Sequence, residues 1–450
     1  MKKDIIQLSD HFSYGRLLRF TLPSIVMMVF TSIYGVVDGI FVSNFAGKTA
    51  FAAINLIMPY IMMFGTLGIM VGTGGTALVS MTMGAGDHKQ ANAIFSQLVY
   101  VCIGFGVILS TAGIALLRPV SIALGAEGQM IDDCVLYGRL TLPALTALIL
   151  QMAFQSFCVA AEKPNLGLGL TIGAGITNIV LDALFVGFFH WGLAGAAIAT
   201  VIGQFAGAFV GLYFNEKYNP EVQFGRRYAK LDGRIIKGIL TVGVPSIIMN
   251  SIGSFMNFSM NQILQSFKET ATGVFGIYFK LQSFFFMPLF GINNATISII
   301  AYNYGARKPE RIIKTLKLAC TVAVCMMTAG LLVFNLLPDL LLGMFNPSEE
   351  FLEIGRAALR IISLGFLISS VPVTVSGALE GMGRGPASLV VCMLRFMIVI
   401  IPVAYILSRT YGATGVWHAF WINEWICALL SGGLFLRVYQ KAKEEPQLPE

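Results

Sequence analysis

The sequence predicts an all-α polytopic membrane protein with twelve transmembrane helices in two six-helix repeats, related by a pseudo-two-fold axis along the membrane normal. Composition is the first reason: 56% of the 450 residues are hydrophobic and only 12% are charged, whereas soluble domains carry about 25% charged residues. An internal repeat is the second reason, and the spacing of the apolar runs is the third. Lipid is therefore the main solvent of this chain.

Four sequence features of the first half return in the second half, 220 to 222 residues later. They are Leu22–Ile25 with Val244–Ile247, Gly84-Ala85 with Gly305-Ala306, Pro164 with Pro386, and Gly192–Gly195 with Gly412–Gly415. Repeated hydrophobic halves are typical of secondary transporters, whose substrate site lies at the interface of the repeats. Because six spans are an even number, we expect both repeats to have the same orientation in the membrane.

Twelve apolar segments reach the roughly 20 residues that a membrane helix needs. In the first half the predicted spans are 17–43, 51–83, 93–117, 135–158, 167–189 and 193–214. In the second half they are 236–265, 273–304, 318–338, 355–379, 389–408 and 413–437. The polar segment 215–234 carries charges of both signs, so we expect it to link an amino-terminal lobe, 1–220, to a carboxy-terminal lobe, 221–450.

Basic residues gather in the polar breaks on one side of the predicted membrane, as at 217–234 and 307–317. This distribution predicts a multi-pass protein of the plasma membrane with both termini in the cytoplasm. It also accounts for the net charge of +7 without a nucleic-acid partner.

The sequence carries no recognisable enzyme or metal-binding motif. Its seven cysteines are scattered singly and form no CxxC pair, which argues against a disulfide framework or a zinc site. It contains neither a GxxxxGK[ST] phosphate loop nor HExxH. We therefore expect a secondary active transporter, not an enzyme, that uses an ion gradient, needs no cofactor and works as a monomer.

The candidate ionisable side chains within the predicted spans are Asp38, Asp182, Lys280, Arg395 and Glu424. A charge in a span costs several kcal/mol and usually faces a cavity. Asp38 and Asp182 lie deepest in the spans of the amino-terminal half. The roles of Lys280, Arg395 and Glu424 stay open, because each can form a structural ion pair or extend toward a membrane surface.

Neutral polar residues surround the two aspartates in the predicted spans. Asn178 precedes Asp182 by four residues and shares its helix face, and Tyr137 and Thr200 can reach the same interior. Two carboxylates in one low-dielectric cavity repel each other, and a proton or a cation relieves that repulsion. The oxygens of Asp38, Asn178, Asp182 and Thr200 also suit a hard cation such as Na⁺. The alternative is that each aspartate bonds a neighbouring helix and only fixes packing.

Two further features predict moving parts and cavity walls. Pro23 allows a kink in the first span, either as a hinge coupled to Asp38 or as a static bend. Methionine and aromatic side chains suit a permissive site for flat, lipophilic cations, although ordinary core packing or lipid contact explains them as well. The candidate wall residues are Met27, Tyr34, Met62, Met256, Met260, Phe285 and Glu424.

These residues resemble the multidrug and toxic compound extrusion (MATE) transporters over essentially the whole chain. The resemblance rests on Tyr34–Val42, on Gly84–Asp87 with its echo Gly305–Arg307, and on Asn178 with Asp182. It implies cation-coupled export of organic cations by alternating access between two six-helix lobes. It also implies an amino-lobe ion site at residues that match Asp38, Asn178, Asp182 and Thr200, with Tyr137 nearby.

The resemblance leaves the coupling ion open. Some relatives have a glutamate on the seventh span, whereas this chain has Asn257 and Asn261 there. We therefore expect multidrug and organic-cation efflux by proton antiport through the amino lobe, with Na⁺ as the second option. A flippase of lipid-linked oligosaccharides or another solute, from the same superfamily, is the alternative function, and an intramembrane enzyme is a third.

Overall fold

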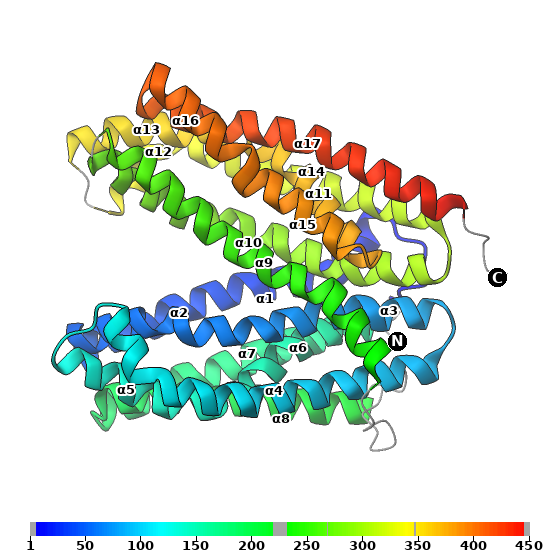
Figure 1. Cartoon of the computed structure of the whole chain (residues 1–450), viewed down its shortest axis with the longest axis horizontal. Helices are drawn as coiled ribbons and strands as arrows, with labels where there is room; N and C mark the ends of the chain where they lie inside the picture. The colour runs from blue at the N-terminus through cyan, green and yellow to red at the C-terminus, as the bar shows by residue number, and fades with distance from the viewer. Residues whose placement is uncertain (1–5, 219–231, 268, 346–347, 445–450) are drawn as a thin grey trace. The chain divides into compact units, whose positions relative to one another are not determined.

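The computed structural model describes residues 6–218, 232–267, 269–345 and 348–444, and the regular structure in these ranges is helical. Among them, eleven helical runs are long and apolar enough to cross a membrane. The pair Glu349–Ser363 and Phe366–Gly381, bent by 51° at its break, makes a twelfth. Figure 1 shows the helices in chain order, from blue to red. The predicted all-α fold with twelve spans is confirmed.

The first half of the chain forms eight helices joined by short irregular turns. They are α1 (Tyr14–Phe41), α2 (Lys48–Met70), α3 (Thr76–Gly84), α4 (His88–Ala123), α5 (Gln129–Thr141), α6 (Leu145–Ala160), α7 (Pro164–Asp182) and α8 (Gly192–Tyr218). Three turns are π-helical, η1 (Val42–Ala46), η2 (Val71–Gly75) and η4 (Ala183–Phe188), and η3 (Leu142–Ala144) is a 3₁₀ turn. Spans predicted as single helices, such as 51–83, are therefore continuous, but their helical register changes at the irregular turns.

The second half repeats this pattern with its own irregularities. It contains α9 (Gly233–Gln265), α10 (Glu269–Gly305), α11 (Pro309–Leu336), α12 (Pro338–Gly343), α13 (Glu349–Ser363), α14 (Phe366–Gly381), α15 (Gly385–Met393), the π-helical η6 (Leu394–Ile398), α16 (Ile400–Tyr411) and α17 (Ala413–Glu444). The helix starts follow local chemistry. Pro309 stands in the first turn of α11, where its missing N–H removes no helical bond, and the Ser348 hydroxyl caps α13.

The repeat is also present in the backbone of the turns. Gly86, after α3, has φ of 83°, and Arg307, the corresponding residue after α10, has φ of 53°. Gly192 and Gly412, at the starts of the last helices of the two halves, have φ of 57° and 63°. The left-handed region favours glycine, so the repeat is kept even where Arg307 occupies a position that glycine would fill with less strain.

Contacts divide the chain into two compact units, Val26–Gly243 on the one hand and Met1–Ile25 with Val244–Glu450 on the other. The boundaries fall inside α1 and α9. The start of α1 belongs with the carboxy-terminal half because it lies against α10, where a Cβ at Gly291 would meet the Cα of Ile25 at 2.7 Å. These units differ from the predicted lobes, 1–220 and 221–450, at the two helix starts. Residues 219–231 of the predicted linker lie outside the described residues.

Small residues bring α8 against α7 within the first unit. A Cβ at Gly203 would lie 3.2 Å from the backbone oxygen of Ala174 and 3.2 Å from the Cβ of Asn178. Close approach of two helix backbones is the usual effect of small residues in membrane helices. It places the polar face of α7 directly beside α8, where the functional residues described next are found.

Candidate ion and substrate site

The two aspartates stand at matching irregularities of their helices. Asp38 precedes the π-helical turn η1 by four residues, and Asp182 is the last residue of α7 before η4. The two π-helical turns contact each other. π-Helical turns shift the register of a helix and often occur at functional sites. They bring α1 and α7 together at the aspartates, and all of this lies within the unit Val26–Gly243.

The site combines side chains from four helices. Asp182, Asn178 and Tyr137 are only 0%, 1% and 2% exposed, whereas Asp38 and Thr200 are half-buried. The carboxyl groups of Asp38 and Asp182 lie close enough to influence each other electrostatically. The five residues that the sequence predicts for ion coupling are thus brought together by α1, α5, α7 and α8.

Hydrogen bonds satisfy only part of this cluster. The Asn178 amide donates to the Thr200 hydroxyl over a long 3.4 Å, and that hydroxyl donates to the carbonyl of Ala196 at 3.0 Å. Four buried oxygens have no hydrogen-bond partner among the described residues: one of Asp38, both of Asp182 and the amide oxygen of Asn178. Buried acceptors without donors are costly and rare, so this cluster is suited to receiving a proton or a cation.

These oxygens fit a monovalent cation in chemical type. Asp38, Asn178, Asp182 and Thr200 offer carboxylate, amide and hydroxyl oxygens, which hard cations prefer. In the described residues no group of three or more His, Cys, Asp or Glu side chains could hold a metal.

A cavity of about 810 Å³ opens beside the cluster. Tyr34, Asp38, Tyr137 and Thr200 line it. Asn178 lines a side pocket of about 60 Å³, which shares Tyr34 and Thr200 with the main cavity. Other wall residues are Phe51, Met58, Met62, Leu148 and Met152. The cavity is thus mostly apolar, with the carboxylate of Asp38 in its wall and Asp182 buried behind it.

The structure separates the predicted wall residues into two groups. Tyr34 and Met62 line the large cavity, while Met256 and Glu424 line a smaller one in the other unit. Three predicted wall residues lie in packed interiors instead: Met27 and Met260 are 1% and 0% exposed, and Phe285 packs edge-on against Phe334. Methionine fills irregular core gaps as readily as cavity walls, so residue type alone could not distinguish the two.

Several polar wall residues escape prediction from the sequence. Gln151, Gln155, Gln204 and Asn55 line the large cavity, and the Gln155 amide donates to the hydroxyl of Thr171 at 3.0 Å. The sequence argument started from charged side chains, and neutral amides carry no charge to single them out. The available clue is the four-residue spacing of Gln151 and Gln155, which places both on one helix face.

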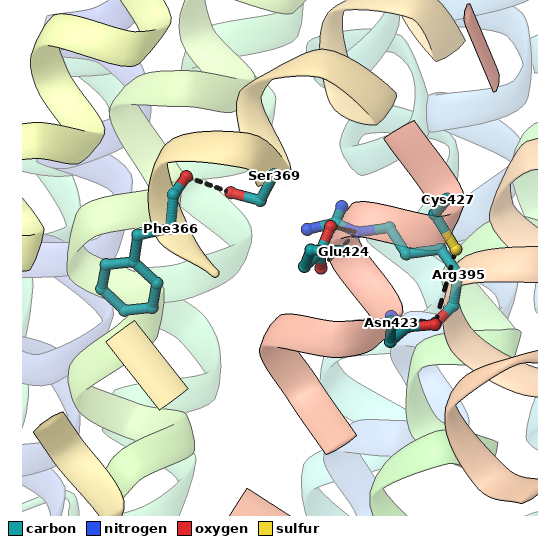
Figure 2. Close-up of polar contacts among 6 residues, drawn as sticks. All are labelled: Phe366, Ser369, Arg395, Asn423, Glu424 and Cys427. Atoms are coloured by element: carbon teal, nitrogen blue, oxygen red, sulfur yellow. Dashed lines mark hydrogen bonds and ion pairs between the residues drawn. The ribbon is translucent and has the colours of Figure 1, made fainter. Parts of the chain in front are cut away.

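The ionisable groups of the second half are arranged differently. The Arg395 Nε donates to both carboxylate oxygens of Glu424, at 2.8 and 3.1 Å (Figure 2). Lys280 is exposed on α10. Glu380 is a buried carboxylate at the end of α14 and accepts a hydrogen bond from Ser388 at 3.0 Å. It lies one residue beyond the predicted span 355–379 and was therefore not a candidate. Of the two readings left open for Arg395 and Glu424, the structure shows the ion pair.

Comparison with known proteins gives one consistent answer. The MatE family model matches residues 23–184 and again 245–406, so each half matches once, 222 residues apart. The multidrug export protein MepA of Staphylococcus aureus (strain MSSA476) is 24% identical over 421 residues, which are 92% of each chain. MepA of Staphylococcus haemolyticus (strain JCSC1435) is 25% identical over 93% of this chain and 92% of that relative.

A solved structure agrees with the fold. The crystal structure of MATE in complex with MaD3S superimposes with a TM-score of 0.91 at 22% identity, covering 99% of this chain and 100% of the other. At this identity the likeness shows the fold alone. The family-model match, in contrast, spans well over half of the sequence, in both repeats. The chain therefore belongs to the MatE family of multi-pass membrane proteins.

Proposed function

We propose that this protein exports lipophilic cations across the cell membrane in exchange for protons, and that Asp38 and Asp182 carry the exchanged charge. The observation that supports this most directly is the group of four buried, unpartnered oxygens beside the large cavity. The relatives named multidrug export proteins support the same direction of transport and a broad substrate range.

The exchange follows from charge balance at two neighbouring carboxylates. When one carboxyl group is protonated, it can donate a hydrogen bond to the other, and the repulsion between Asp38 and Asp182 is removed. A lipophilic cation beside Asp38 compensates the same negative charge from the cavity. Proton and substrate therefore compete for one charge, and each favours the conformation in which it binds better. Alternating access between the two halves then gives antiport.

The cavity suits the proposed substrate class. Its volume of about 810 Å³ lies within the roughly 300–1,000 Å³ of typical small-molecule sites. Met58, Met62 and Met152 provide flexible, polarisable walls, and the rings of Tyr34 and Tyr137 can face a cation. No lysine or arginine is among the described residues that line it. That argues for cations over the pyrophosphate of a lipid-linked oligosaccharide, the flippase alternative.

Sodium is a second candidate for the coupling ion. The free amide oxygen of Asn178 favours it, because a proton on the carboxyl pair does not need that oxygen, whereas Na⁺ uses amide and hydroxyl oxygens as ligands. The two ions lead to different predictions for Asn178→Leu. The substitution should abolish sodium-driven transport and leave proton-driven transport largely intact.

Transport of an ethidium-like dye into proteoliposomes with separately imposed pH and sodium gradients tests the proposal. We expect dye movement driven by the pH gradient alone, lost in Asp38→Asn and kept in Asp132→Asn, the same change at an exposed residue paired with Arg118. Movement driven only by sodium would refute the proton assignment. Full transport by Asp38→Asn, with protein amounts matched, would refute the role of the carboxyl pair.

We further propose that the protein works as a monomer in the plasma membrane. Both of its termini should lie in the cytoplasm, since the basic loops fall on one side of the spans. Cysteine-free protein with single cysteines at position 132 or position 308 provides the test. A membrane-impermeant thiol reagent added to intact cells should label the first site and not the second. The opposite pattern would reverse the orientation.

A further inference from the structure

A second, smaller cavity lies within the carboxy-terminal unit, whereas the two aspartates belong to the other unit. Its volume is about 150 Å³. Side chains of α9, α10, α16, α17 and η6 line it, including Phe279, Phe286, Phe290, Phe396 and Phe420. The Arg395–Glu424 ion pair forms its polar part, with side chains only 6% and 14% exposed. The proposed export of cations makes no use of this cavity.

The guanidinium group of Arg395 is only partly engaged. Within the described residues it donates hydrogen bonds from Nε alone, and both bonds go to Glu424 (Figure 2). A guanidinium carries five N–H donors, and its two amino groups have no acceptor among the described residues. Its central carbon lies 4.9 Å from the centre of the Phe396 ring and 5.7 Å from that of Phe286. The free edge of Arg395, meaning the side of the guanidinium that carries the two amino groups, therefore lies by aromatic rings at the cavity.

The backbone around Arg395 is fixed by a second set of bonds. Asn423 donates from its amide to the backbone carbonyl of Arg395 at 3.0 Å, and accepts from the thiol of Cys427 at 3.4 Å. Both residues appear beside the ion pair in Figure 2. Asn423 thus holds the π-helical turn η6, which aims the guanidinium. A site whose donors are preorganised in this way costs a ligand little rearrangement.

Charge and size define the ligand that fits. A cavity of about 150 Å³ is known to hold a benzene ring, and the aromatic walls favour a flat ring. The amino groups of Arg395 match a carboxylate in bidentate geometry. An added anion would leave the neutral pair with one negative charge too many, which a low-dielectric interior disfavours. The charge is balanced if one proton enters with the anion and is held by Glu424.

We propose that this cavity binds small aromatic carboxylic acids, with the ligand carboxylate on the free edge of Arg395 and the ligand's proton on Glu424. In this step Glu424 gains the proton that the acid loses, the salt bridge to Nε weakens, and Arg395 keeps its charge. Net charge in the cavity is unchanged. The chain would then carry two sites of opposite preference: unpaired carboxylates for cations in one unit, and an arginine edge for weak acids in the other.

Isothermal titration calorimetry of the purified full-length protein with benzoate tests the proposal. We expect one site per chain that binds benzoate and not benzylammonium, which has the same ring and the opposite charge. Because one proton is taken up with the anion, the affinity should fall about tenfold for each unit of rising pH. Binding should also survive Asp38→Asn, so its outcome is independent of the proposed proton-coupled export.

Two variants locate the site. Arg395→Met combined with Glu424→Gln removes both charges without leaving an unpaired ion, and benzoate binding should be lost. Gly253 lines the cavity, and a Cβ there meets no atom within 4 Å. Gly253→Phe should fill the cavity and abolish binding with the ion pair intact. Gly276→Phe, at an exposed α10 position that is equally open, is the matched control and should bind normally.

The outcomes are decisive even if the double variant fails to fold, because the two glycine variants leave the ion pair unchanged. Absence of benzoate binding to the unmodified protein would show a purely structural ion pair and refute the proposal. Equal binding of benzylammonium, affinity independent of pH, or full binding by Gly253→Phe would each refute it as well.

Discussion

The two halves of this protein are related by an internal repeat, but they differ in whether their buried charged side chains have partners. The family model aligns them 222 residues apart. With that offset, the cavity residue Tyr34 and the proposed coupling residues Asp38, Tyr137, Asn178 and Asp182 correspond to Met256, Met260, Leu359, Ile400 and Ala404. All five of these counterparts belong to a single hydrophobic core cluster of the carboxy-terminal unit. The positions of an unsatisfied polar cluster in one half are thus occupied by apolar side chains of a core cluster in the other, where Met256 and Ile400 also line the small cavity.

The reverse comparison gives the same lesson. Arg395 corresponds to Gly173 at the 222-residue offset, and Glu424 corresponds to Gln204 at the 220-residue offset of the last helices. The carboxy-terminal half therefore has its own charged pair at positions where the first half has none, and that pair is internally compensated. The same repeat therefore holds buried carboxylates without partners in one half and an ion-paired carboxylate in the other.

The largest difference expected between the halves is in transport. Asp182→Asn should reduce dye export to background and leave the thermal stability unchanged or higher, because it removes a buried carboxylate that has no donor. Export by purified protein in liposomes, with melting followed in detergent, measures both. A loss of folding in this variant would mean that Asp182 is a packing residue.

The same acid-to-amide change in the other half should act on stability. Glu424→Gln leaves the buried charge of Arg395 uncompensated, which costs roughly 3–5 kcal/mol. We expect a clearly lowered melting temperature, largely recovered when Arg395→Met is added. If Glu424→Gln melts like the unmodified protein, the ion pair contributes nothing to the fold and the contrast between the halves fails.

Prolines at the unit boundaries should have an intermediate effect. Pro23 and Pro245 are equivalent in the repeat and stand beside the boundaries inside α1 and α9. If Pro23 is a hinge, Pro23→Ala should slow export several-fold while equilibrium dye binding stays normal. Pro245→Ala provides the comparison. Unchanged export rates in both variants would favour static kinks.

The smallest effects should come from the turns. Gly86→Ala and Gly383→Ala place a Cβ at φ of 83° and 70°, and each should cost about 1 kcal/mol. Gly104→Ala, in the middle of α4 where a Cβ meets no atom within 4 Å, should instead stabilise by up to about 1 kcal/mol. Chemical denaturation of the three variants compares them. Equal changes in the free energy of unfolding at all three positions would contradict the backbone strain expected at Gly86 and Gly383.

Local signals explain why so much of the site was predictable. Asp38 and Asp182 are conspicuous because a charge interrupts an apolar run, and Asn178 follows from helical spacing. The same reasoning assigned Met27, Met260 and Phe285 to a cavity wall although they lie in packed interiors. Apolar side chains satisfy a core and a cavity equally well, so sequence spacing does not discriminate between them. Glu380 was missed because it stands at the edge of its span.

The sequence by itself determined the helical membrane fold, the duplication and the two acids of the amino-terminal half, because hydropathy, repeat offset and the cost of charge in lipid are properties of the chain read along its length. Only the tertiary structure decided which polar atoms have partners. Asp38 and Asp182 lie next to each other without donors, while Glu424 is matched by an arginine 29 residues earlier in the chain. Partnership depends on how helices pack, and packing is set by contacts between residues distant in sequence.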